Sequence, residues 1–206
     1  MIGVLIRREN SDVANEYYVK GIEKFGGTVI LINDNDSRKE LEDKLSRVDG
    51  ILLTGGDDVG PIDFYLISYV LENKLKLLGI CQGMQSMCLY GSSLGLIPIG
   101  NDSHKRDEGY VHGVTLSDGV LREVFGMSKV MVNSHHLQTV SRSCLFRVVG
   151  YSDDGLIEAV EGDGPVFQVG VQWHPERMLE YDEGSWKLLE RFVKSEWSCY
   201  LVVFFN

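Results

Sequence analysis

A sharp turn around Cys81 constrains the fold of this chain more than any other feature. A largely apolar segment at 75–78 precedes the turn, and Gly79 and Gly83 flank the cysteine. A strand that turns directly into a helix needs small residues around a strained central residue, and the helix N-terminus favours a thiolate there. The pattern predicts an α/β fold with Cys81 as a nucleophile. A buried structural cysteine is the alternative that the pattern alone leaves open.

A second motif, His174-Pro175-Glu176, follows another apolar segment later in the chain. Pro175 favours extended backbone at His174, and alternate residues of an extended chain point to the same side. Glu176 can then orient the His174 imidazole. Together with Cys81, this pair predicts a nucleophile, a base and an orienting carboxylate, whereas the motif alone is more typical of a surface turn.

Four further motifs accompany these two. They are Tyr18 with Gly26-Gly27, the segment 54–59, the segment 132–134 with His136 and Gln138, and the segment 154–160. The six motifs in this order resemble a class I glutamine amidotransferase domain of the triad type, in particular the γ-glutamyl-γ-aminobutyrate hydrolase branch. The resemblance implies a flavodoxin-like α/β fold.

The hydrophobic pattern of the first half predicts alternating strands and helices. Strands are expected at 3–6, 28–32, 50–54 and 76–80, and helices at 15–25, 38–45, 64–73 and 82–90. Such alternation predicts an open, mostly parallel sheet with helices on both faces. The second half is expected to be β-rich, with strands at 111–116, 129–133, 146–152, 157–161 and 166–172 and a closing helix at 185–195. A single domain over 1–206 is expected from the length.

Charge and cysteine spacing exclude several classes. The net charge of −10 argues against a nucleic-acid surface, since phosphate binding needs clustered Lys and Arg. The four cysteines, Cys81, Cys88, Cys144 and Cys199, show no paired spacing typical of disulfide or zinc frameworks. Without a leader segment or a membrane-length apolar run, we expect a cytoplasmic protein that does not bind a membrane. The apolar tail at 199–206 leaves an extra strand, a homodimer contact and an altered terminus open.

An oxyanion hole is expected beside Cys81. One donor is the backbone N–H of Gln82, and the other comes from the Gly55-Gly56 turn, at Gly56. A plain structural turn is the alternative for these glycines. The resemblance implies substrate contacts at Gly55, Gln85, Asn133, Ser134, His136 and Tyr18. Relatives often carry Arg at the position of Gln82, so a specificity that depends on that charge is not carried over.

We expect neither a cofactor nor a metal. Asp57-Asp58 is interpreted as a solvated loop, and Glu158 as a supporting or structural carboxylate. Adjacent histidines of an extended chain point to opposite sides, so His135 and His136 are poor joint ligands. A zinc site built from His104, His112 and this pair is therefore the less favoured alternative.

The leading hypothesis is a hydrolase of γ-glutamyl amides that acts through a γ-glutamyl thioester on a small-molecule substrate. No synthetase domain is visible beside the predicted site. The short connection from Val59 to Phe64 predicts a pocket that is open on the leaving-group side. The first alternative is a glutaminase subunit that delivers ammonia from glutamine to a separate synthetase. A non-catalytic ligand-binding module is the second.

Overall fold

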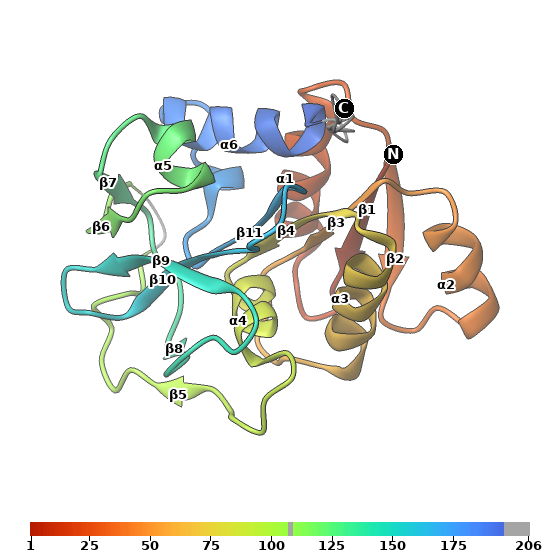
Figure 1. Ribbon diagram of the computed structural model, residues 1–206, viewed down its shortest axis with the longest axis horizontal. Helices are drawn as coiled ribbons and strands as arrows, with labels where there is room; N and C mark the ends of the chain where they lie inside the picture. Colours follow the sequence, from red (N-terminus) through yellow and green to blue (C-terminus); the bar gives the residue numbers. More distant parts are fainter. Residues whose placement is uncertain (107–108, 196–206) are drawn as a thin grey trace, which may run out of the picture.

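The computed structural model describes residues 1–106 and 109–195 of the protein (Figure 1), so the apolar tail lies outside the described residues. In this part of the chain one mixed sheet has the strand order β2-β1-β3-β4-β11-β10-β9-β6-β7. Its parallel half consists of β1 (Ile2–Ile6), β2 (Val29–Asn33), β3 (Gly50–Leu53), β4 (Lys76–Ile80) and β11 (Gln168–Val171). Its antiparallel half consists of β10 (Ile157–Glu161), β9 (Arg147–Ser152), β6 (His112–Leu116) and β7 (Lys129–Val132). The predicted mostly parallel first half and β-rich second half are confirmed.

Helices cover both faces of this sheet (Figure 1). One face carries α1 (Asp12–Glu23), α5 (Val120–Phe125) and α6 (Glu183–Lys194), and the other carries α2 (Arg38–Leu45), α3 (Pro61–Asn73) and α4 (Gln82–Leu89). Each face has its own core. Ile22, Leu121 and Leu188 pack in one apolar cluster, while Leu66 and Met84 pack in the other. The predicted class of fold, a sheet between two helical layers, is therefore confirmed.

Local signals explain most helix starts. Ser37 and Glu40 form a reciprocal capping box at the start of α2. Pro61 occupies the first turn of α3 after Gly60, so this helix begins earlier than the predicted residue 64. Proline suits that position because its missing N–H has no intrahelical acceptor there. The connection from Val59 to α3 is consequently even shorter than predicted.

Short elements complete the described fold. A two-stranded antiparallel sheet pairs β5 (Ile97–Pro98) with β8 (Gln138–Thr139), and a 3-10 turn, η1, spans Pro175–Arg177. None of the helices in residues 1–106 and 109–195 has the length and apolar character needed to cross a membrane.

Candidate active site

Cys81 lies at the sharp turn between β4 and α4, with φ 53° and ψ −107°. A residue with a side chain rarely adopts positive φ, and such strain is typical of functional sites. A Cβ atom at Gly79 would lie 2.7 Å from the carbonyl carbon of Gly83, and one at Gly83 would overlap the backbone of Leu53. Both flanking glycines are thus required by close backbone packing, and the predicted elbow is present.

His174 and Glu176 form a buried pair beside this elbow. Nδ1 of His174 lies 2.7 Å from Oε1 of Glu176, and both side chains are almost fully buried. The sequence predicts extended backbone between them, but the chain turns there because Pro175 begins η1. Asn133 fixes the backbone of His174 from both sides: its Oδ1 accepts from the His174 N–H at 2.8 Å, and its Nδ2 donates to the His174 carbonyl at 2.9 Å.

The charges of this trio favour a thiolate and an imidazolium. Burial lowers the pKa of His174, but the negative charges of Glu176 and Cys81 outweigh it and raise the pKa to about 9. Burial likewise raises the pKa of the Cys81 thiol, yet the positive charge of His174 brings the net pKa below its ordinary value. Cys88 differs, because burial raises its pKa to about 12. Cys81 is therefore the activated thiol of the two.

The end of β3 lies next to the elbow, since β3 and β4 are parallel neighbours. The N–H of Gly55 donates to the Tyr18 hydroxyl at 3.0 Å. A Cβ atom at Gly56 would overlap the Gln82 side chain, so Gly56 lies directly against the start of α4. The Gln82 N–H belongs to the first turn of that helix, where no intrahelical acceptor exists. Gly56 and the start of α4, where the two oxyanion donors are expected, thus lie side by side.

A buried ion pair supports this arrangement and was missed by the sequence analysis. Arg7 Nη2 lies 2.6 Å from Asp63 Oδ1, and Arg7 Nε donates to the Thr54 carbonyl at 3.1 Å. Asp63 also accepts from the Gly60 N–H at 3.1 Å and from the Ser86 hydroxyl at 3.0 Å. The pair therefore ties β1, α3 and α4 to the loop that carries Gly56. No local pattern marks Arg7 or Asp63 as buried.

Gln82 adds a second support, through its side chain. Its Nε2 donates to the carbonyl oxygen of Asp58. The amide thus holds the loop at 57–58 against the start of α4.

A cavity of about 270 Å³ opens onto Cys81. Its lining consists of Gly56, Asp57, Asp58, Cys81, Gln85, Lys105, His135, His136, Leu137 and Gln138. Gln85 and His136 were expected at the substrate and Gly56 in the oxyanion hole, and all three line this cavity. Gln85 is held in place because its Nε2 donates to the Gln138 carbonyl at 3.0 Å and to Gln172 Oε1 at 3.1 Å.

The other four expected substrate contacts lie behind this lining. Tyr18 accepts from Gly55, and Asn133 holds the His174 backbone. Ser134 donates its hydroxyl hydrogen to the His104 carbonyl at 2.8 Å. The structure thus gives Tyr18, Gly55, Asn133 and Ser134 supporting contacts around the cavity.

A strained cysteine with a lowered pKa at a strand-to-helix elbow, with a buried His–Glu pair beside it, is the arrangement of a cysteine hydrolase-type enzyme of the class I glutamine amidotransferase kind. The chain belongs to the Peptidase C26 family, whose model matches residues 5–65 and 62–176. The matched segments contain Cys81, His174 and Glu176. The predicted resemblance is therefore confirmed at the level of the family.

Some relatives are named as glutamine amidotransferases and others as gamma-glutamyl hydrolases. A candidate glutamine amidotransferase of Schizosaccharomyces pombe is 31% identical over 87% of this chain and 81% of its own length. The gamma-glutamyl-gamma-aminobutyrate hydrolase of Escherichia coli K12 is 27% identical, with 85% of each chain covered. Among solved structures, a candidate GMP synthase protein from Thermoplasma acidophilum matches with a TM-score of 0.65 over 94% of this chain and 92% of that one. At 19% identity, that last likeness shows the fold alone.

Proposed function

We propose that this protein hydrolyses γ-glutamyl amides through a γ-glutamyl thioester on Cys81. The observation that carries the proposal is the buried His174–Glu176 pair, 2.7 Å apart, beside a strained cysteine that opens into a cavity. The family description supports it, because a peptidase cleaves amide bonds with water. The similarity to a relative named as a gamma-glutamyl-gamma-aminobutyrate hydrolase points to the γ-glutamyl group.

The residues suit each step of such a reaction. The Cys81 thiolate attacks the γ-carbonyl carbon, and the carbonyl electrons move to oxygen, where the N–H groups of Gly56 and Gln82 stabilise the charge by about 3–4 kcal/mol per donor. The C–N bond breaks as His174 Nε2 gives its proton to the departing amine. His174 then takes a proton from water, which attacks the thioester, releases glutamate and regenerates the thiol.

Charged side chains of the cavity fit the amino acid end of a γ-glutamyl group. That end carries an ammonium and a carboxylate, and the cavity is lined by Asp57 and Asp58 together with Lys105. We assign the ammonium to the aspartates and the carboxylate to Lys105. Lys105→Met should accordingly raise KM for γ-glutamyl amides while leaving the reactivity of Cys81 toward iodoacetamide unchanged.

The leaving amine is expected to be variable. The connection between Val59 and α3, which starts at Pro61, is too short to form a wall on that side. We therefore propose strict demand for the γ-glutamyl group and tolerance of bulky amines. The test is kcat/KM across γ-glutamyl amides of increasing size. A decrease of more than about a hundredfold with size, or roughly 2.7 kcal/mol, would show a closed pocket.

One experiment tests the reaction itself. The purified protein is incubated with a γ-glutamyl amide, glutamate release is measured, and the intact mass is recorded for a thioester adduct. Cys81→Ala should lose both turnover and adduct, whereas the exposed-cysteine control Cys144→Ser should keep both. Full activity in Cys81→Ala would contradict the proposal.

A glutaminase subunit is the second candidate. The observation in its favour is similarity to a glutamine-hydrolyzing GMP synthase subunit of Methanococcus aeolicus, at 27% identity over 80% of this chain and 82% of that one. A glutaminase subunit should be slow alone and faster with its synthetase. Glutamine hydrolysis that rises when a purified synthetase is added, with poor turnover of other γ-glutamyl amides, would favour this candidate.

A further inference from the structure

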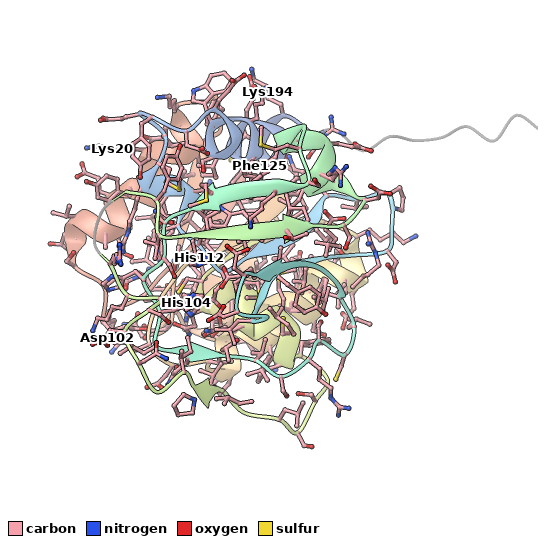
Figure 2. All side chains as sticks on the ribbon, turned by 90° about the vertical axis from the view of Figure 1, so that its left-hand side faces the viewer. Lys20, Asp102, His104, His112, Phe125 and Lys194 are labelled. Atoms are coloured by element: carbon pink, nitrogen blue, oxygen red, sulfur yellow. The ribbon has the colours of Figure 1, made fainter. Side chains whose placement is uncertain are left out.

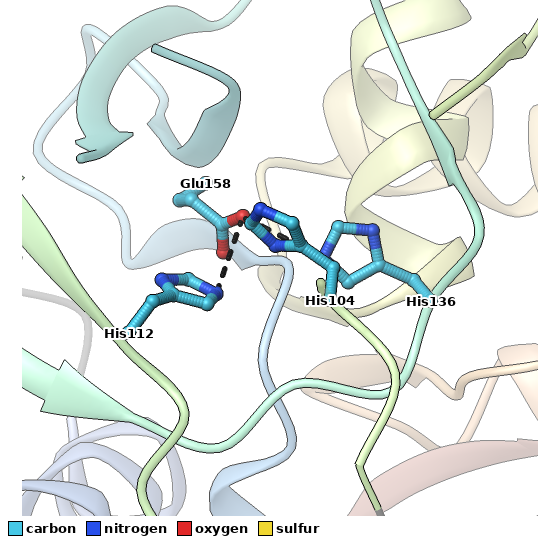
Figure 3. Close-up of side chains that lie close together, drawn as sticks. All are labelled: His104, His112, His136 and Glu158. Carbon is cyan, nitrogen blue, oxygen red and sulfur yellow. Dashed lines mark ion pairs between the residues drawn. The ribbon is translucent and has the colours of Figure 1, made fainter. Parts of the chain in front are cut away.

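Three histidines and one glutamate converge behind the active-site cavity. Their donor atoms, from His104, His112, His136 and Glu158, all lie within 4.8 Å of one another (Figure 3). His104 and His112 lie side by side (Figure 2), with ring centroids 4.4 Å apart. Glu158 comes from β10, His112 begins β6, and the other two histidines lie in loops.

The separations from Glu158 exceed hydrogen-bond lengths and approach those between ligands of one metal ion. Oε1 of Glu158 lies 3.6 Å from His104 Nδ1, 3.8 Å from His112 Nε2 and 3.5 Å from His136 Nε2. Hydrogen bonds between such atoms are about 2.7–3.2 Å long. Tetrahedral zinc has its nitrogen and oxygen ligands about 2.0–2.2 Å away, which places the ligands about 3.3–3.6 Å from one another.

The outer nitrogen of every ring already has an oxygen partner. His104 Nε2 lies 3.0 Å from Asp154 Oδ2, His112 Nδ1 lies 3.3 Å from the Gly113 carbonyl, and His136 Nδ1 lies 2.9 Å from the Gln138 carbonyl. These oxygens only accept, so each outer nitrogen carries the hydrogen. Metal-binding histidines show this same arrangement, which fixes the tautomer. In a neutral ring the inner nitrogen then presents a lone pair.

The inner atoms lack other partners. Within the described residues, neither carboxylate oxygen of Glu158 has a hydrogen bond, and neither does Nε2 of His112 or His136. Glu158 has no exposed surface. Ser134 Oγ lies 3.4 Å from His104 Nδ1, but its hydrogen goes to the His104 carbonyl. A buried carboxylate without donors is strongly destabilising unless a cation accompanies it.

We propose that His104, His112, His136 and Glu158 bind one divalent transition-metal ion of the zinc type. Three imidazoles and one carboxylate are ligands that such ions favour, and four protein ligands in a buried setting indicate a structural site. The ion fixes His136, which lines the cavity beside Cys81, and anchors the segment before β6 to β10. The sequence analysis ranked this possibility below a site without metal, and His135 is not among the four residues.

The test measures zinc binding and needs no turnover, so its outcome is independent of the proposed reaction. Cysteine and histidine are both common zinc ligands, so Cys81 and His174 would compete for the added ion. Every protein in this test is therefore the full-length chain with Cys81→Ser. The protein is stripped with EDTA, and Zn²⁺ is added in competition with a chromophoric chelator. We expect about one equivalent bound per chain with a raised Tm. Co²⁺ in place of Zn²⁺ should give visible absorption bands without a thiolate charge-transfer band.

Matched variants locate the ion. Glu158→Gln removes the charge of the carboxylate ligand and His112→Ala removes one imidazole ligand. Each should weaken zinc binding by more than about tenfold, as should Asp154→Asn, which changes the outer partner of His104. His135→Ala, a change at the neighbouring histidine outside the cluster, should leave the affinity within about twofold.

Two results would overturn the proposal. One is binding of less than about a tenth of an equivalent of zinc by the folded Cys81→Ser protein. The other is zinc binding that the cluster variants leave unchanged. Asp154 is half-exposed, so Asp154→Asn is expected to fold. Its zinc affinity decides between the outcomes if a variant at a buried ligand fails to fold. Failure to bind zinc would mean that ion pairs between protonated histidines and Glu158, rather than a metal ion, hold the four side chains together.

Discussion

Replacing Glu176 with Gln should reveal how far the chemistry depends on one buried carboxylate. Gln keeps the shape of the side chain that lies 2.7 Å from His174 Nδ1, but it removes the charge. That charge is the main influence that opposes burial and raises the pKa of His174 from 6.5 to about 9. This rise corresponds to roughly 3 kcal/mol of preference for the imidazolium. We therefore expect kcat/KM for γ-glutamyl amides to fall by roughly a hundredfold.

The pH dependence of activity should change in a defined direction in this variant. A group with a raised pKa keeps its proton until the pH passes that value, so wild-type activity should decline on the alkaline side near pH 9. In Glu176→Gln the imidazolium loses its partner, and the alkaline limb should move to lower pH. The assay is kcat/KM against pH, with Glu180→Gln as the control, because Glu180 is an exposed carboxylate a few residues further along the chain. A variant with wild-type rate and an unmoved limb would replace the triad with a Cys–His dyad.

Three further predictions concern the same site. Iodoacetamide should label Cys81 before any other cysteine in a peptide map, because a thiol with a lowered pKa is more fully ionised at a given pH; earlier labelling elsewhere would count against the elbow thiol. Asn133→Ala removes two hydrogen bonds to the His174 backbone and should lower the free energy of unfolding in urea by roughly 1–3 kcal/mol, with a larger relative loss in kcat than in KM. Gly79→Ala places a Cβ atom 2.7 Å from Gly83 and should destabilise the fold by roughly 1–3 kcal/mol or more, and a wild-type urea midpoint would refute the close packing.

The fold could be predicted from sequence wherever an element is long enough to show a period. The bounds of α2 and β4 agree with the prediction, and those of α3 differ only at its start. The six-residue helix α5 and the two-residue strands β5 and β8 were missed, because such short elements complete no hydrophobic repeat.

The trio at Cys81 was predictable because each part has a local signal, the glycine-flanked elbow and the His-Pro-Glu turn. The buried pair of Arg7 and Asp63 was not, since its members lie far apart in sequence and each looks like an ordinary surface charge. The difference is physical. Backbone strain and helix capping depend on residues that are neighbours in the sequence, whereas the burial of a charge depends on which distant segments pack over it.

The histidine cluster follows from strand pairing, which a single sequence does not specify. The strands β3, β4 and β11 end at the edge that holds Cys81 and His174. Beyond β11 the sheet becomes antiparallel, so β10 and β6 begin at that edge and β7 ends there, with His112 opposite Val132. Glu158 near the start of β10, His112 at the start of β6 and His136 after β7 are thereby brought to one place. A change of one residue in any of these registers would turn a side chain to the other face of the sheet. The convergence of the cluster is thus a property of the antiparallel half, and zinc binding would test that register as directly as it tests the ligands.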